Sequence, residues 1–152
     1  MLRFGTSEFF KYLKDTLNSD KSFREFGRGS YTTTELIYLK DLKIGVWQKT
    51  TDGEIEEFFL VPKKKLAKKE KEAEIIYYVN DYDTLIRLLK GDDSFVSLVI
   101  DGTLEFKGPM KKALQIQAAS DRMEVIIRKV CSESVLPTKI QFQKWAAGEG
   151  YL

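Results

Sequence analysis

The residues that come nearest to a catalytic pattern are three aspartates in the middle of the chain. Asp92 and Asp93 are adjacent, and Asp101 closes the same short segment. Two carboxylates in one cleft can act as general acid and general base when their environments push their pKa values apart. Acids beside Gly91 and Gly102 more often cap helices and form turns. An enzymatic role for these aspartates therefore requires that folding brings two of them into one cleft.

The residue types that usually activate nucleophiles or bind metals are scarce. The chain has no histidine and one cysteine, Cys131. The absence of histidine removes Ser/His and Cys/His nucleophiles and His-ligated metals, and a single cysteine leaves no internal disulfide and almost no basis for structural zinc. Neither a P-loop nor a dinucleotide-binding glycine motif occurs. We therefore expect no catalytic residues, metal or cofactor, with carboxylate catalysis or an acidic magnesium site as the alternatives.

Composition indicates one ordinary globular domain. The chain has 152 residues, of which 43% are hydrophobic and 12% aromatic, and its net charge is +2. So small a charge gives no reason to expect a nucleic-acid partner. No run approaches the ~18 apolar residues of a transmembrane helix, and the start lacks the apolar core of a signal peptide. We expect a cytoplasmic protein, and the ending Gly150-Tyr151-Leu152 is not a peroxisomal address.

A basic run lies between two apolar segments. Residues 62–74 read PKKKLAKKEKEAE and are too polar to form core. Charge runs of this kind are usually solvated, so a solvent-exposed loop with at most a helical turn is the simplest interpretation. The alternative is contact with anionic lipid headgroups, worth about 1 kcal/mol per lysine near such a surface. The candidate contact residues are Lys63, Lys64, Lys65, Lys68, Lys69 and Lys71.

The segment 31–79 predicts an antiparallel meander of three or four strands. β-branched and aromatic residues are concentrated in it, and Thr51-Asp52-Gly53 is a hairpin signal. Adjacent apolar pairs, such as Phe58 and Phe59, would point to opposite faces of the sheet. We therefore expect both faces to be covered. The expected strands are 32–39, 43–49, 54–61 and 74–79.

The segment 82–117 predicts three helices and one strand. Tyr82, Leu85, Ile86 and Leu89 lie on one helical face, which Asp81 can cap and Gly91 can end. A second helix is expected after a cap at Asp92 or Asp93, then a strand at 103–107, then a helix that starts at Pro109. A further helix is expected after a break near 119–121, with Asp121 and Glu124 as a capping box.

Aromatic residues mark both ends of the chain. Thr6 can cap a helix that carries Phe10, Leu13 and Leu17 on one face, and Phe23 and Phe26 follow it. Either these residues are plain core, or the phenylalanines flank a ligand cavity. Near the other end, Phe142 and Trp145 are expected to dock on the rest of the domain.

Two short motifs follow one another in the middle of the chain. The first, NDYDTLIRLLKG, ends at Gly91, and the second, GTLEFKG, spans 102–108. With the following helix that carries Met110 and Leu114, they resemble the sterol carrier protein type-2 lipid-binding domain. The overlap is plausible over 31–117, and the order and spacing of the motifs carry it more than either motif alone.

The resemblance implies an α+β fold in which helices cover a mostly antiparallel five-stranded sheet. It implies one domain over 1–152, best matched over 31–117, with a helical extension at 118–152. Between sheet and helices it implies a hydrophobic tunnel for fatty acids, acyl chains, phospholipids or sterols. The residues that would line this tunnel are Phe95, Leu98, Val99, Leu104, Phe106, Met110 and Leu114.

Two functions from different classes follow from this interpretation. One is binding or transfer of a hydrophobic small molecule, with transient contact to an anionic membrane. The other is a protein–protein interaction or oligomerisation module of the same fold without a lipid ligand. Cavity volume separates them, because a ligand pocket should reach about 300 Å³ or more.

Overall fold

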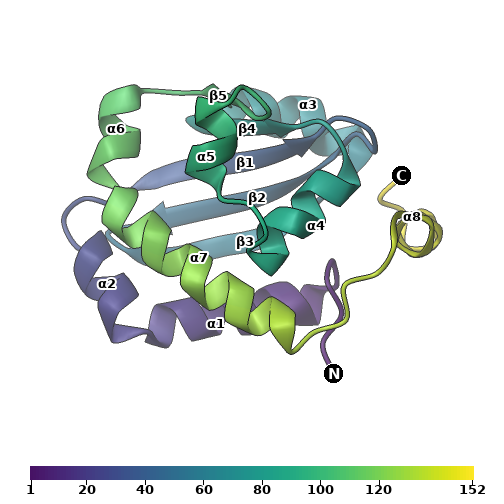
Figure 1. Cartoon of the computed structure of the whole chain (residues 1–152), viewed down its shortest axis with the longest axis horizontal. Coiled ribbons are helices and arrows are strands. Elements are labelled where there is room, and N and C mark those ends of the chain that lie inside the picture. Colours follow the sequence, from purple (N-terminus) through teal and green to yellow (C-terminus); the bar gives the residue numbers. More distant parts are fainter.

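A five-stranded sheet forms the centre of the computed structural model, which describes residues 1–152 (Figure 1). Its strand order is β3-β2-β1-β4-β5. The strands are β1 (Thr33–Leu39), β2 (Ile44–Thr51), β3 (Glu54–Val61), β4 (Ile75–Val79) and β5 (Glu105–Lys107). The predicted hairpin is present, with positive φ angles of 48° at Asp52 and 77° at Gly53.

The sheet is mixed rather than purely antiparallel, which corrects one detail of the sequence prediction. β1 pairs antiparallel with β2, β2 with β3 and β4 with β5, but β1 and β4 are parallel. A parallel pair needs a crossover connection. The helix between β3 and β4 supplies it, so β4 lies beside β1 instead of extending the meander beyond β3.

Helices cover both faces of the sheet, as expected. Figure 1 shows α4, α5, α6 and α7 on the near side of the sheet and α3 beyond it. The helices are α1 (Ser7–Ser19), α2 (Lys21–Gly27), α3 (Lys63–Glu72), α4 (Tyr82–Lys90), α5 (Phe95–Ile100), α6 (Met110–Gln115), α7 (Gln117–Ser132) and α8 (Lys139–Gly148). No helix is both long enough and apolar enough to cross a bilayer.

The basic run forms a helix, so the prediction of a loop is wrong, although most of its lysines are exposed to solvent as expected. Leu66 of α3 is buried and packs on one face of the sheet with Leu36, Trp47, Val61 and Ile76. The lysines surround this single apolar contact, and Lys69 lies 4.1 Å from the centre of the Trp47 ring. One leucine, one cation–π contact and a hydrogen bond of 2.7 Å from the Tyr78 hydroxyl to Glu70 thus dock a helix whose composition is otherwise that of a solvated segment.

The caps of the middle segment agree only in part with the sequence prediction. The Asp81 carboxylate accepts a hydrogen bond from the Thr84 amide at 2.8 Å, and Gly91 ends α4 with φ at 82°. Both features were expected. Ser94, not Asp92 or Asp93, caps α5. A serine directly before the first helical residue is as good a cap as aspartate.

The break between the last inward-facing helices lies at Ile116, earlier than predicted. No capping box forms at Asp121, because that residue is already within α7. Ile116, Ala119, Met123, Ile126 and Val130 are all buried. Their spacing of three and four residues forms one helical stripe that passes through the predicted break at 119–121. The sequence pattern was therefore in phase from Ile116 onward.

The C-terminal helix docks through its aromatic side chains, as expected. Phe142 is 1% exposed, and its ring centre lies 5.9 Å from that of Phe4 and 4.9 Å from that of Tyr82. The Tyr82 hydroxyl donates a hydrogen bond to the Pro137 carbonyl at 2.7 Å. These contacts join α8 to α4 and to the residues before α1.

Candidate ligand cavity between the sheet and the helices

A cavity of about 460 Å³ lies between the sheet and the helices on its near side. Of the 29 residues that line it, 23 are hydrophobic. Small-molecule sites are typically apolar cavities of roughly 300 to 1,000 Å³. The volume is therefore large enough for a ligand, and a close-packed core would not leave such a space.

Five of the seven predicted tunnel residues line this cavity: Phe95, Val99, Phe106, Met110 and Leu114. Leu98 and Leu104 do not. They are 5% and 2% exposed and belong to the close-packed core beneath α5. Contact of the seven residues with a lipid remains a prediction.

The cavity also has walls that the tunnel prediction left out. Phe4 lies just before α1, whose Phe9, Phe10 and Leu13 line one side, and Met123 and Ile127 of α7 line another. The aromatic pattern near the N-terminus had allowed this role for Phe10, Phe23 and Phe26, and only Phe10 of these three lines the cavity. Part of the wall therefore lies outside the segment 31–117.

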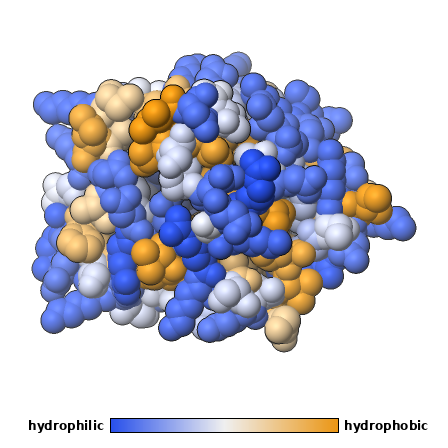
Figure 2. Space-filling model, viewed as in Figure 1, coloured by the Kyte–Doolittle hydropathy of each residue, from blue (hydrophilic) through white to orange (hydrophobic).

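The cavity reaches the surface between α5 and α6. Four of its lining side chains are exposed: Val96, Ile100, Met110 and Leu114, with Ile100 at 80% and Leu114 at 68%. Figure 2 shows apolar surface gathered over α5 and α6 on this side of the molecule. These four residues are called the mouth. An apolar rim around an apolar cavity suits the entry of a hydrophobic molecule.

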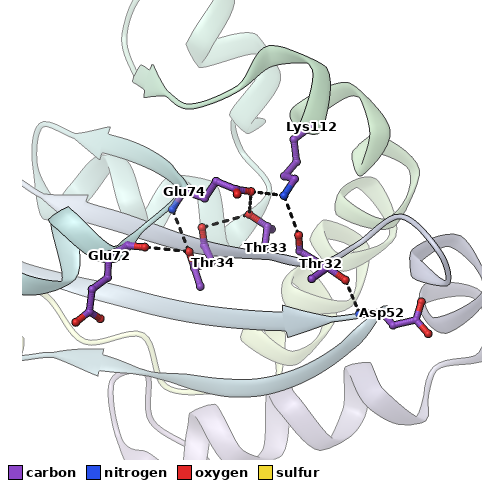
Figure 3. Close-up of polar contacts among 7 residues, drawn as sticks. All are labelled: Thr32, Thr33, Thr34, Asp52, Glu72, Glu74 and Lys112. Carbon is purple, nitrogen blue, oxygen red and sulfur yellow. Dashed lines mark hydrogen bonds and ion pairs between the residues drawn. The ribbon is translucent and has the colours of Figure 1, made fainter.

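A polar network holds α6 beside the mouth. Lys112 of α6 forms an ion pair with Glu74, and its Nζ also donates to the Thr32 carbonyl at 3.1 Å (Figure 3). Glu74 in turn accepts a hydrogen bond from the Thr33 hydroxyl at 2.9 Å. The hydrogen bond from Lys112 lowers the pKa of the Glu74 carboxyl. Because α6 has no buried residue, this network is its main attachment to the sheet.

Removing the lysine should therefore loosen α6. We expect Lys112→Met to increase the amide hydrogen exchange rates of 110–115 about tenfold, since methionine keeps the apolar stem but loses the charge. Hydrogen exchange with mass spectrometry measures this change. Lys111→Met is the matched control, because Lys111 is exposed and forms no ion pair. Equal protection in both variants would show that the network does not hold α6.

A polar cluster of Tyr31, Glu35, Gln48 and Thr50 interrupts the apolar sheet wall. The Tyr31 hydroxyl donates to the Glu35 carboxylate, and the Gln48 amide donates to the Tyr31 oxygen at 3.0 Å and to the Thr50 oxygen at 2.9 Å. Burial raises the pKa of Glu35 to about 7, opposed by the Tyr31 hydrogen bond. Glu35 is surrounded by protein, and its accessible surface faces the cavity.

The sequence did not single out Glu35, although a signal was available. Every second residue of β1 points to the same face of the sheet, and on one face these are Thr33, Glu35, Ile37 and Leu39. Ile37 and Leu39 pack in the main core. A carboxylate in phase with these apolar residues must point into the interior. Such a residue is costly to bury and is often functional.

The three aspartates named above do not meet in the cavity. Asp93 pairs with Arg87 at 2.9 Å, and Asp101 accepts a hydrogen bond from the Thr103 amide at 2.8 Å. None of the three lines the cavity, and no cluster of acidic or cysteine side chains could hold a metal ion. Burial raises the pKa of the Cys131 thiol to about 12, which disfavours the thiolate.

The carboxyls that do line the cavity are Glu35, Asp121 and Glu124. Burial also raises the pKa of Glu124, which accepts a hydrogen bond from the Phe95 amide at 3.4 Å and lies 3.8 Å from Arg128. Two carboxyls with raised pKa values in one cavity are the feature that the enzyme alternative required. They are not the residues that the sequence indicated.

The lysines of α3 lie on the opposite face of the sheet from the cavity, as the packing of Leu66 and Figure 1 show. Lys69 also pairs with Glu72 at 3.1 Å. Contact of these lysines with a membrane stays a prediction.

Comparison with solved structures shows a sterol-carrier-protein-2-like fold. A crystal structure of sterol carrier protein 2 superposes with a TM-score of 0.68 at 18% identity, covering 83% of this chain and 98% of that one. The solution structure of a conserved hypothetical protein from Thermus thermophilus, for which a sterol carrier role is suggested, gives 0.69 at 18% identity, covering 91% and 94%. No protein-family model and no curated protein matches the sequence.

Proposed function

We propose that the protein binds a hydrophobic small molecule of the lipid class in the cavity and carries it through the mouth. The single observation behind this proposal is the cavity of about 460 Å³ with its apolar lining and exposed apolar rim. Enclosing an acyl chain is favourable by about 0.8 kcal/mol per CH₂. The fold shared with sterol carrier protein 2 supports the same function.

An open apolar cavity is also what separates this proposal from a module that only binds other proteins. A cavity of this size leaves lining atoms without packing partners, which lowers stability unless something fills the space. A protein–protein interaction module of the same fold would be more stable if its own side chains filled this space. The volume therefore favours ligand binding over pure oligomerisation.

Plugging the cavity tests the proposal. Ala113 of α6 lines the cavity next to the mouth, whereas Ala118 of α7 is exposed and points away from it. We expect Ala113→Trp to weaken binding of an uncharged, environment-sensitive dye at least about tenfold, because the indole occupies ligand space. Fluorescence titration measures the affinity.

Ala118→Trp is the control for the added indole and should bind the dye like the wild type. Equal binding by both variants would show that the dye does not enter the cavity. Mass analysis of a recovered natural ligand adds a second result: an unaltered ligand supports binding and carriage, and a chemically altered one supports catalysis by the cavity carboxyls.

A further inference from the structure

The sheet wall of the cavity changes from polar to apolar within one step along the strands. Glu35 of β1 lies opposite Gln48 of β2, Ile37 lies opposite Val46, and Leu39 lies opposite Ile44. Residues two apart on a strand are about 7 Å apart on the same face. Thus one end of this wall offers the polar atoms of Glu35 and Gln48, and the next step offers the hydrocarbon of Ile37 and Val46, with Tyr77 of β4 beside Ile37.

Three polar atoms on this wall have no partner in the protein. They are Glu35 Oε1, Gln48 Oε1 and the Tyr77 hydroxyl, since the hydrogen bonds of the cluster use other atoms. The only unpartnered side-chain atoms sealed from solvent are the Nε atoms of Arg24 and Arg128. The three atoms are therefore accessible, and the space that Glu35, Gln48 and Tyr77 border is the cavity.

A partly buried acceptor without a partner is stabilised by a ligand group that donates a hydrogen bond to it. Gln48 is 7% exposed, Glu35 is partly buried, and both border a mostly apolar cavity, so bulk water solvates them less than it would on the surface. A hydroxyl group offers one donor and two acceptor positions. Its hydrogen can be donated to Glu35 Oε1 or Gln48 Oε1, and its lone pairs can accept from the Tyr77 hydroxyl, which lies one step along the wall on β4. This is the complement of the three free atoms.

We propose that Glu35, Gln48 and Tyr77 form a subsite for the terminal hydroxyl of an uncharged amphiphile, whose hydrocarbon part lies along the apolar wall toward Phe10 and Leu85. This inference rests on the proposed function, because it assigns the ligand class of the same cavity. It also fixes the orientation of the ligand: the polar end lies on the β1–β2 wall, and the chain lies among the aromatic residues at the other end of the cavity.

The charges around the cavity disfavour a fatty-acid carboxylate. No lysine or arginine lines the cavity, and its ionisable carboxyls are Glu35, Asp121 and Glu124. A ligand carboxylate beside Glu35 would find no cation, and two like charges in a low-dielectric space repel strongly. An anionic ligand would therefore bind only when one of the two carboxyls holds a proton.

A cationic amine fits less well than a hydroxyl. Asp121 already accepts from the Gln117 amide at 2.7 Å, and Glu124 faces Arg128, so Glu35 is the one carboxylate left for an ammonium. An ammonium has three donors and no acceptor, so it cannot accept from the Tyr77 hydroxyl. It must also lose its hydration, which a single carboxylate offsets poorly.

Competition with the uncharged dye tests the subsite. Decan-1-ol, decanoic acid, decan-1-amine and decane are titrated against the dye-loaded protein at about pH 8, where the Glu35 carboxyl is largely ionised. We expect the alcohol to bind at least about tenfold more tightly than the acid and more tightly than the alkane and the amine.

Glu35→Gln should weaken binding of the alcohol by about threefold to tenfold and strengthen binding of the acid, because the amide keeps the shape of the side chain and removes its charge. Glu105→Gln, on the exposed side of β5, should change neither.

The outcomes separate the two proposals. If the dye and decane bind but the acid binds as tightly as the alcohol, or the amine binds more tightly than the alcohol, the subsite is wrong and the cavity function stands. Unchanged affinities in Glu35→Gln would also overturn the subsite. If neither the dye nor any of the four compounds binds, both proposals fail.

Discussion

The change in the free energy of unfolding caused by Glu35→Gln should be about 3 kcal/mol more stabilising at pH 8 than at pH 4. Burial raises the pKa of this carboxyl from 4.5 to about 7 in the folded protein. The folded state therefore holds the proton more tightly than the unfolded state, and the wild type loses stability as the pH rises from about 4.5 to about 7. Each pKa unit corresponds to about 1.4 kcal/mol, and glutamine has no charge to lose.

Urea unfolding of both proteins between about pH 4 and pH 9 gives this difference. Other carboxyls act in the opposite direction: hydrogen bonds lower the pKa values of Asp20, Glu74 and Asp81, so their contributions are present above about pH 4 and lost below it. They titrate in both proteins and cancel in the difference. Parallel stability curves would mean that Glu35 is not enclosed as the structure shows.

Phe106→Asp should lose both ligand binding and stability. Phe106 lines the cavity and packs edge-on against Tyr77 with 5.5 Å between ring centres. An aspartate there puts an unpaired charge beside Tyr77 in an apolar wall and removes an aromatic contact. We expect the free energy of unfolding to fall by about 2 kcal/mol or more and dye affinity to fall about 100-fold.

Lys107→Asp provides the matched comparison for Phe106→Asp. Lys107 is the next residue of β5, is exposed and points to the other face of the strand. It should leave dye affinity unchanged and cost little stability. A folded Phe106→Asp protein with wild-type affinity would show that this residue is not part of the ligand wall.

Local patterns explain how much of the fold could be predicted. The Asp52-Gly53 turn and the alternation of apolar residues were sufficient for the hairpin of β2 and β3, and Asp81 and Gly91 were sufficient for the ends of α4. The parallel pairing of β1 with β4 depends on a crossover between distant segments, which no local pattern contains. The helix α3 was missed because Leu66 alone marks its buried side.

In the candidate site, too, local patterns predicted some features, and contacts between distant segments set the others. The apolar pattern of the segment 95–114 indicated five side chains of the cavity wall, because periodicity shows which residues face inward. Periodicity does not show whether an inward side chain meets core or open space, so Leu98 and Leu104 were grouped with the others. The polar cluster depends on Gln48 facing Glu35 across two strands, and that register is set by the whole sheet.

A buried carboxylate that lowers stability is consistent with a functional constraint. An apolar residue at Glu35 would remove the cost of burying a charge and would suit the packing of Ile37 and Leu39 on the same face. Natural proteins keep such locally unfavourable residues mainly at functional sites. The gain in stability expected for Glu35→Gln and its expected loss of alcohol binding are two sides of one trade-off.

Native mass spectrometry of the protein, purified from the organism that makes it, tests the ligand-binding proposal most directly. We expect a fraction of molecules to carry one small hydrophobic molecule per chain, released by organic extraction. Ala113→Trp should lack this adduct, and Ala118→Trp should keep it, because only the first indole enters the cavity. An adduct-free wild type that also fails to take up the uncharged dye would contradict the proposed function, since the cavity would then hold no ligand.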